Sequence, residues 1–226
     1  MAAASALAST KVANPEFTDL LAEAERAHGH LCAGQILGVR MAMFALGRLG
    51  IDQPRKKLLA TGEPNPDRKR PVVFVEIDRC ATDAIAVVTG ARVGKRALKL
   101  RDWGKMAATF VDLDAKLGLD AGPDQYKGLR VVALETSKDR ARDLYPDLPR
   151  NEQQMRAYRE LPDADLFAEE WVAVPLPASE FPGFKGTRAL CDRCGEGINF
   201  DRFEDHQGRR LCLPCAHPET LYYRPL

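Results

Sequence analysis

Apolar positions near the start of the chain repeat with the period of a helix. Over residues 17–27 they recur at spacings of three and four: Phe17, Leu20, Leu21 and Ala24. A second helix is predicted after Gly34, with a buried face that consists of Ile36, Leu37, Met41, Phe44 and Leu49. Gly34, Gly38 and Gly47 in this segment predict close approach, either by a neighbouring helix or by a ligand.

Further along the chain, runs of β-branched and aromatic residues predict strands. They cover residues 72–77, 106–113, 129–135 and 171–174. Helices are predicted over 80–89, 138–144 and 152–161, and the first of these ends at Gly90. The basic stretch 54–71 is rich in proline and predicts a loop. The pattern therefore indicates a domain that contains both helices and strands.

Composition and charge exclude several classes of protein. With 45% hydrophobic and 29% charged residues, the chain has the composition of a folded protein. A formal net charge of +1 gives no overall attraction for nucleic acid or for an anionic membrane. No apolar run reaches the length of a membrane span, and residues 1–14 lack the parts of a signal peptide. We therefore expect a cytoplasmic protein, whose paired cysteines bind metal or act in redox chemistry.

Four of the 6 cysteines fall within the last 36 residues, where they form two CxxC pairs 17 residues apart: Cys191, Cys194, Cys212 and Cys215. Each CxxC turn brings two thiolates to one side of a tight loop. Two such turns complete the tetrahedral sulfur shell that zinc prefers. The segment between them, 199–211, predicts a β-hairpin. Rubredoxin-like iron and a redox-active dithiol pair are the alternatives to zinc.

We expect this zinc to be structural, because so short a ribbon cannot bury enough apolar area to fold without metal. His206 and His217 lie nearby, but four thiolates already fill the shell, so we interpret both as bystanders. From Lys185 onward the chain has 7 basic and 6 acidic residues. That balance gives no basic surface for nucleic acid, and it favours docking of a protein or bracing of the main domain.

The remaining cysteines and histidines form a second candidate cluster: His28, His30, Cys32 and Cys80. His28 and Cys32 would share a face of a helix, whereas His30 and Cys32 would share a side of a strand. A cysteine at a helix N-terminus favours the thiolate. Burial and simple hydrogen bonding are the ordinary alternatives. Together the four residues predict a second transition metal or metal cofactor, and Cys32 and Cys80 are also candidate nucleophiles or redox thiols.

These motifs carry a family resemblance. His28-Gly29-His30-Leu31-Cys32-Ala33-Gly34, followed by Gly38 and Arg40, resembles the opening motif of the FmdE/FwdE family of formylmethanofuran dehydrogenase subunits. Cys80-Ala-Thr-Asp83, then Thr89-Gly90, Gly94-Lys95 and Asp102-Trp-Gly104-Lys105, resembles the family's central signature. A C-terminal zinc ribbon is also frequent in that family. The resemblance implies an α+β fold with helices packed on a mixed sheet, similar to the second domain of glyceraldehyde-3-phosphate dehydrogenases. It also implies a metal-binding homodimer.

The predicted domain organisation follows from these motifs and from the change of composition near Arg188. It comprises a flexible leader, an FmdE-like α+β domain, a linker, and a zinc ribbon with a tail: 1–14, 15–175, 176–187 and 188–226.

Two positions depart from the family pattern. Members commonly carry Pro at the position of Ala33 and Cys at the position of Ala91, and chemistry that depends on that cysteine would be lost or altered here. Asp83 is a candidate to orient a histidine at the metal site, or else it favours the N-terminus of its helix. Lys95 is a candidate to face an anionic ligand, or else it is a solvated loop charge.

Three functions fit these features. The first is an accessory protein of metal or redox metabolism that holds a second metal and has a protein partner in that system. The next is a structural component of a formylmethanofuran dehydrogenase-type oxidoreductase. The last is an enzyme that uses Cys32 or Cys80. We rank them in that order, because the absence of cysteine at Ala91 weighs against the enzyme.

Overall fold

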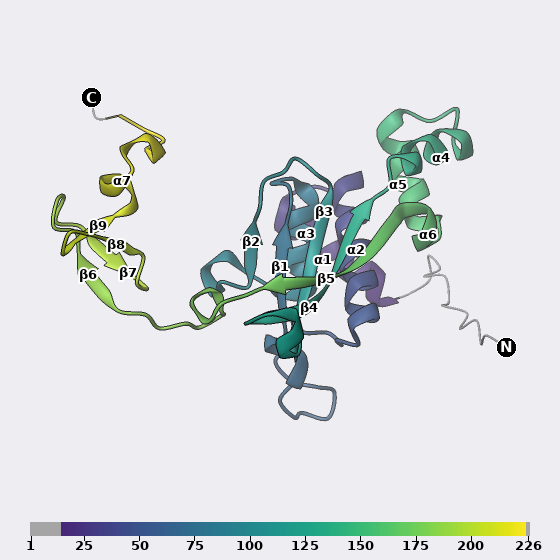
Figure 1. Cartoon of the computed structure of the whole chain (residues 1–226). Helices are drawn as coiled ribbons and strands as arrows, with labels where there is room; N and C mark the ends of the chain where they lie inside the picture. The colour runs from purple at the N-terminus through teal and green to yellow at the C-terminus, as the bar shows by residue number, and fades with distance from the viewer. Residues whose placement is uncertain (1–14, 225–226) are drawn as a thin grey trace. The chain divides into compact units, whose positions relative to one another are not determined.

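The computed structural model describes residues 15–224, which form two compact units that divide between Leu176 and Pro177 (Figure 1). The division falls at the start of the predicted linker, 176–187. The predicted leader, 1–14, lies outside the described residues.

Five strands form the mixed sheet of the first unit, in the order β2-β1-β3-β4-β5. β1 (Pro71–Val75) is parallel to β2 (Leu98–Leu100) and antiparallel to β3 (Ala107–Lys116). β4 (Gln125–Ala133) and β5 (Phe167–Pro175) extend the sheet by antiparallel pairing. Because successive side chains of a strand point to opposite faces, half of each central strand faces the core.

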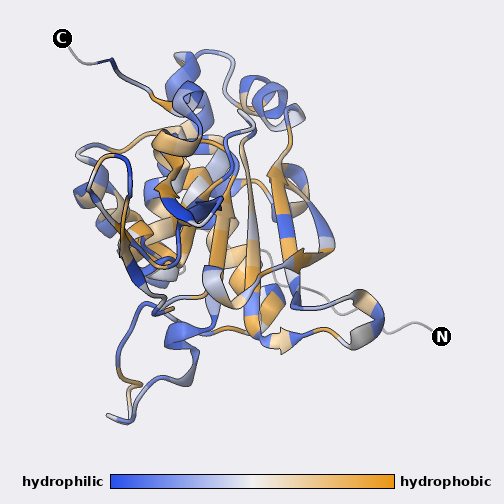
Figure 2. Ribbon diagram, turned by 60° about the vertical axis from the view of Figure 1, so that its left-hand side comes forward, coloured by the Kyte–Doolittle hydropathy of each residue, from blue (hydrophilic) through white to orange (hydrophobic). Residues whose placement is uncertain are grey.

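Three helices supply the other half of that core: α1 (Pro15–His28), α2 (Ala33–Leu49) and α3 (Cys80–Thr89). α2 is apolar on nearly all sides, as befits a helix that is buried among neighbours. Its Ile36 joins one apolar cluster with Ile85 of α3 and with Phe110 and Leu129 of the sheet. Figure 2 shows the apolar residues concentrated along these strands.

In the sequence, the segment that connects β4 to β5 forms three more helices: α4 (Thr136–Leu144), α5 (Arg150–Glu160) and α6 (Asp163–Leu166). Arg40 of α2 joins α5 and α6 to the core. It is almost fully buried, and it donates to the carbonyls of Tyr158 (3.0 Å) and Leu161 (2.5 Å) and to Asp163 Oδ1 (2.5 Å). A buried guanidinium needs such partners, which explains one position of the opening motif.

The second unit consists of two small antiparallel pairs and one short helix: β6 (Arg188–Leu190), β7 (Gly197–Asn199), β8 (Phe203–His206), β9 (Arg209–Cys212) and α7 (Leu213–Ala216). Gln207 and Gly208 join β8 to β9, both with positive φ (56° and 81°). That two-residue turn matches the twist of paired strands. Short 3-10 helices complete the chain: Pro66–Lys69, Val93–Lys95, Leu119–Ala121, Ala178–Glu180 and Pro218–Thr220.

The predicted α+β class with a mixed sheet is confirmed, but several short elements differ from the sequence prediction. β2, α6 and the β6–β7 pair were not predicted, because three- and four-residue elements form through tertiary pairing rather than local pattern. β5 is longer than the predicted 171–174, since charged residues at a sheet edge obscure its alternation. Within residues 15–224, no helix combines the length and the apolar composition that a membrane span requires.

Candidate metal centres

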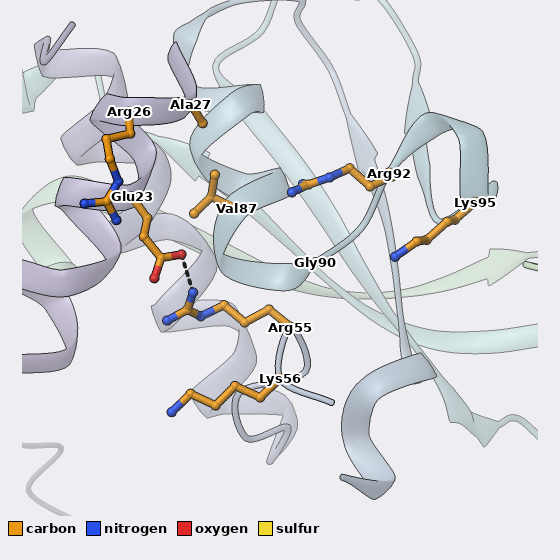
Figure 3. A pocket seen from close by; sticks show the side chains of 9 residues that line it. All are labelled: Glu23, Arg26, Ala27, Arg55, Lys56, Val87, Gly90, Arg92 and Lys95. Carbon is orange, nitrogen blue, oxygen red and sulfur yellow. Dashed lines mark hydrogen bonds and ion pairs between the residues drawn. The ribbon is translucent and has the colours of Figure 1, made fainter. Parts of the chain in front are cut away.

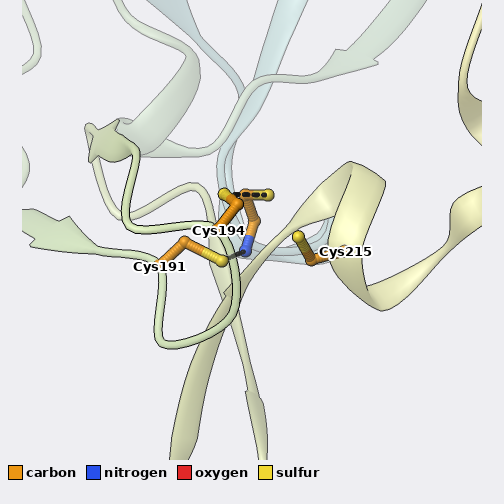
Figure 4. Close-up of side chains that lie close together, drawn as sticks. Cys191, Cys194 and Cys215 are labelled. Carbon is orange, nitrogen blue, oxygen red and sulfur yellow. Dashed lines mark hydrogen bonds between the residues drawn. The ribbon is translucent and has the colours of Figure 1, made fainter. Parts of the chain in front are cut away.

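The four C-terminal cysteines converge in the second unit. Cys191 follows β6, Cys194 lies in the turn before β7, Cys212 ends β9 and Cys215 lies in α7. Their sulfur atoms all lie within 4.8 Å of one another, and those of Cys194 and Cys212 are 3.8 Å apart. Zinc bonded to four sulfurs at about 2.3 Å in a tetrahedron would place them about 3.8 Å apart. The donor set and its spacing therefore fit zinc (Figure 4).

Backbone N–H groups near this cluster favour the negatively charged thiolate that a metal cation binds. Hydrogen bonds from the backbone N–H groups of Cys194 and Cys212 lower the pKa of Cys191 to about 6. Hydrogen bonding with Cys212 and burial raise the pKa of Cys215 to about 12. Crowded thiols cannot all ionise together without a counter-charge. A divalent metal supplies that charge and displaces the protons.

Neither nearby histidine belongs to the four-sulfur group. His217 Nε2 and His206 Nε2 lie 2.9 and 3.2 Å from Glu204 Oε2. Hydrogen bonding with Glu204 raises the pKa of His217. Both rings therefore bind a carboxylate, which accords with the bystander interpretation.

A second group of metal-binding side chains forms where α1 ends and α2 begins. His28 is the last residue of α1, and Gly29 then turns the chain with a φ of 96°. The ring of His30 returns to 4.8 Å from the ring of His28, between centroids. Cys32 is the N-cap of α2. One donor atom from each of the three lies within 4.8 Å of the others.

The first turn of α3 brings Asp83 and Cys80 to this group. Asp83 Oδ2 lies 2.8 Å from His28 Nδ1. Burial raises the pKa of Cys80, and hydrogen bonding with Cys32 raises it further. Cys80 is therefore next to Cys32, although the three-residue group defined by mutual donor distances does not include it. A raised pKa disfavours the thiolate form of Cys80, which weakens its case as a nucleophile.

Close packing of α2 against α3 creates this juxtaposition. A Cβ atom at Gly38 would lie 2.5 Å from the Ala81 carbonyl oxygen, and one at Gly34 would lie 3.1 Å from Cys80 Cβ. These glycines therefore serve helix packing, one of the two roles that the sequence left open. Gln35 also joins the helices, since its buried amide donates to the Cys80 carbonyl at 2.5 Å. This role of Gln35 was not predicted from the sequence. The feature that could have indicated it is a polar residue within an otherwise apolar helix.

Ala91 and Lys95 lie at the other end of α3. The ten residues of this helix span about 15 Å, so Ala91 is remote from Cys80 and is buried in the core. A cysteine there would not complete the cluster around His28. Lys95 instead lines a pocket at that end, together with Arg92. Four of the predicted second-site residues thus come together with Asp83, and Lys95 does not join them.

Two family models match this chain, one in each of its two parts. Residues 27–168 match the family model "FmdE, Molybdenum formylmethanofuran dehydrogenase operon". Residues 186–220 match "Prokaryotic dksA/traR C4-type zinc finger". A solved protein from Syntrophus aciditrophicus, described as FmdE-like and named after a tungsten formylmethanofuran dehydrogenase, superposes with a TM-score of 0.59 over 95% of this chain and 100% of that chain. At 19% identity, this likeness shows the fold.

One curated relative is described as a probable S-adenosyl-L-methionine-binding protein of Archaeoglobus fulgidus. It is 30% identical over 90% of this chain, which spans 55% of the relative's length. The family model alone covers more than half of the chain. The chain therefore belongs to the FmdE family, and it carries a C4-type zinc finger in its C-terminal part.

Proposed function

We propose that the FmdE domain binds a second transition metal ion through His28, His30 and Cys32. The convergence of two imidazoles and one sulfur, with donor atoms within 4.8 Å, is the observation that carries the proposal. Imidazole and thiolate are ligands that suit zinc, iron, cobalt, nickel and copper. Three protein ligands leave a coordination position for a small molecule, which distinguishes this site from the closed sulfur shell of the finger.

Asp83 and Cys80 support the ligands in this proposal. Asp83 holds His28 Nδ1, so Nε2 is the nitrogen that can bind metal. Cys80 hydrogen-bonds to Cys32 from the adjoining helix. The group is partly open to solvent, since His30 is exposed whereas His28 and Cys32 are half-buried. Metal and small ligands can therefore reach it.

The proposed role is that of a cytoplasmic accessory protein in metal or redox metabolism, which forms a homodimer and docks a protein partner. The finger supports docking, because it exposes large apolar side chains at Leu190, Phe200, Leu213 and Tyr222. Purification of the tagged protein from native extract tests the partner. A stable oxidoreductase complex would favour the alternative of a structural component, and light scattering of the pure protein measures the oligomer.

Metal stoichiometry tests the second site directly. We expect two metal ions per chain after reconstitution with Co²⁺, by elemental analysis and by thiolate-to-cobalt absorption. The double variant His28→Ala/Cys32→Ser should retain one ion, and the control His206→Ala should retain two. One ion in the unsubstituted protein, or no loss in the double variant, would overturn the proposal.

A second candidate function comes from the Archaeoglobus fulgidus relative, whose description names S-adenosyl-L-methionine. Its 30% identity over 90% of this chain is the observation in favour. Isothermal titration of S-adenosyl-L-methionine into the full chain tests this candidate, and the absence of saturable binding would contradict it.

A further inference from the structure

A pocket of about 760 Å³ lies between α1, the end of α3 and the loop before β1. Nine residues line it: Glu23, Arg26, Ala27, Arg55, Lys56, Val87, Gly90, Arg92 and Lys95. In Figure 3 the side chains of Arg92 and Lys95 extend toward the α1 side, where Glu23 and Arg26 lie. The volume falls within the range of small-molecule sites in proteins, about 300–1,000 Å³.

The lining is strongly basic. Five of the nine side chains are Arg or Lys and one is acidic, in a chain whose net charge is only +1. The single acid, Glu23, is committed to an ion pair with Arg55, whose hydrogen bond lowers the pKa of Glu23. Within residues 15–224, the Lys95 amine has no hydrogen bond or ion pair. Clustered cations repel one another unless an anion lies among them.

Backbone contacts form this pocket without a ligand. Gly90 ends α3 with a φ of 70°, and a Cβ atom there would lie 2.9 Å from Arg55 Cα. Glycine therefore lets the loop that carries Arg55 and Lys56 pack against the end of α3. Arg92 Nη1 donates to the Ala86 carbonyl at 2.6 Å. This contact with a neutral carbonyl holds the Arg92 guanidinium in place without neutralising its charge.

We propose that this pocket binds a small molecule through a diphosphate group. Arginine guanidinium groups match phosphate oxygens in pairs, and lysine adds point charges. Cations approach from three segments, namely α1, the loop before β1 and the segment after α3, which suits a ligand with two adjacent phosphoryl groups. The pocket and the His28 cluster are distinct, since Ala27, which directly precedes His28, lines the pocket whereas none of the cluster residues does.

Isothermal titration with inorganic pyrophosphate tests the proposal on the full, metal-replete chain. We expect saturable binding that weakens with added salt. The charge-reversal variant Lys56→Glu/Lys95→Glu should bind about tenfold more weakly or worse. The matched control is Lys57→Glu/Lys69→Glu, which makes the same charge change at exposed lysines outside the pocket. The control should bind like the unsubstituted protein, and zinc content and thermal unfolding check that both variants fold.

Three results would overturn the proposal. They are no saturable pyrophosphate binding, equal weakening in the pocket and control variants, and tighter binding of citrate than of pyrophosphate. The last would assign the pocket to polycarboxylates. The variant His28→Ala/Cys32→Ser should bind pyrophosphate unchanged, so failure of the second metal site and failure of this pocket are distinguishable.

Discussion

At the scale of single residues, the second metal cluster depends on the orientation of His28. Its Nδ1 is 2.8 Å from Asp83 Oδ2, and the side chain of His28 is only 17% exposed. Asp83 is 56% exposed and belongs to the first turn of α3. Both roles that the sequence allowed for Asp83 are therefore compatible with its place, since it faces a histidine and also lies at a helix N-terminus.

Replacing Asp83 with alanine should weaken the second metal site and leave the zinc finger intact. Loss of a carboxylate that orients a metal-binding histidine typically lowers metal affinity about 10–100-fold. Competition between the protein and a chromophoric chelator measures the affinity. Asp78→Ala serves as the control, because Asp78 is exposed on the segment just before α3. Equal metal affinity in the two variants would show that Asp83 acts only on its helix.

At the scale of elements, the contact between α2 and α3 brings the two halves of the cluster together. Cys32 lies at the start of α2 and Cys80 at the start of α3. The helices approach at Gly38, where the nearest backbone atom of Ala81 would be 2.5 Å from a Cβ. The glycine is therefore the structural reason that the two cysteines meet.

Gly38→Ala should lower the free energy of unfolding by about 1–3 kcal/mol, because the added methyl group overpacks the helix contact. Gly47→Ala offers a matched control in the same helix, since a Cβ there meets nothing within 4 Å. That control should be neutral or more stable by about 0.5–1 kcal/mol, because alanine favours helix. Urea unfolding followed by circular dichroism gives both values. A Gly38 variant as stable as the Gly47 variant would refute the close contact.

The sequence predicted those elements whose bounds depend on residues close together in the chain. The helix over 80–89 matches α3 because Gly90 supplies the left-handed residue that ends it. The HGHxC spacing likewise placed His28, His30 and Cys32 together. β2 and the basic pocket were not predicted, since β2 forms only by pairing with β1 and the pocket combines residues from three separate segments. Such tertiary features can be recognised only once the fold is known.

At the scale of the molecule, the two units owe their stability to different sources. The first has a continuous apolar core that joins helices α1–α3 to the sheet. Among the described residues of the second unit, only Ala189, Cys191 and Ile198 are buried apolar positions. Three small or medium side chains cannot offset the entropy of ordering that segment. We therefore expect zinc binding to supply its folding free energy.

Removal of zinc should unfold the second unit while the first keeps its structure. Cys194→Ser, or treatment with a strong chelator, deprives the metal of its tetrahedral shell, and structural zinc in small fingers contributes on the order of 10 kcal/mol. Limited proteolysis with mass spectrometry should then show cleavage within 188–220 and protection of the α1–β5 region. The matched variant Cys80→Ser, in the other cluster, should leave 188–220 resistant. Resistance of the zinc-depleted finger would mean that its fold does not depend on metal, and cleavage throughout both units would mean that they unfold as one.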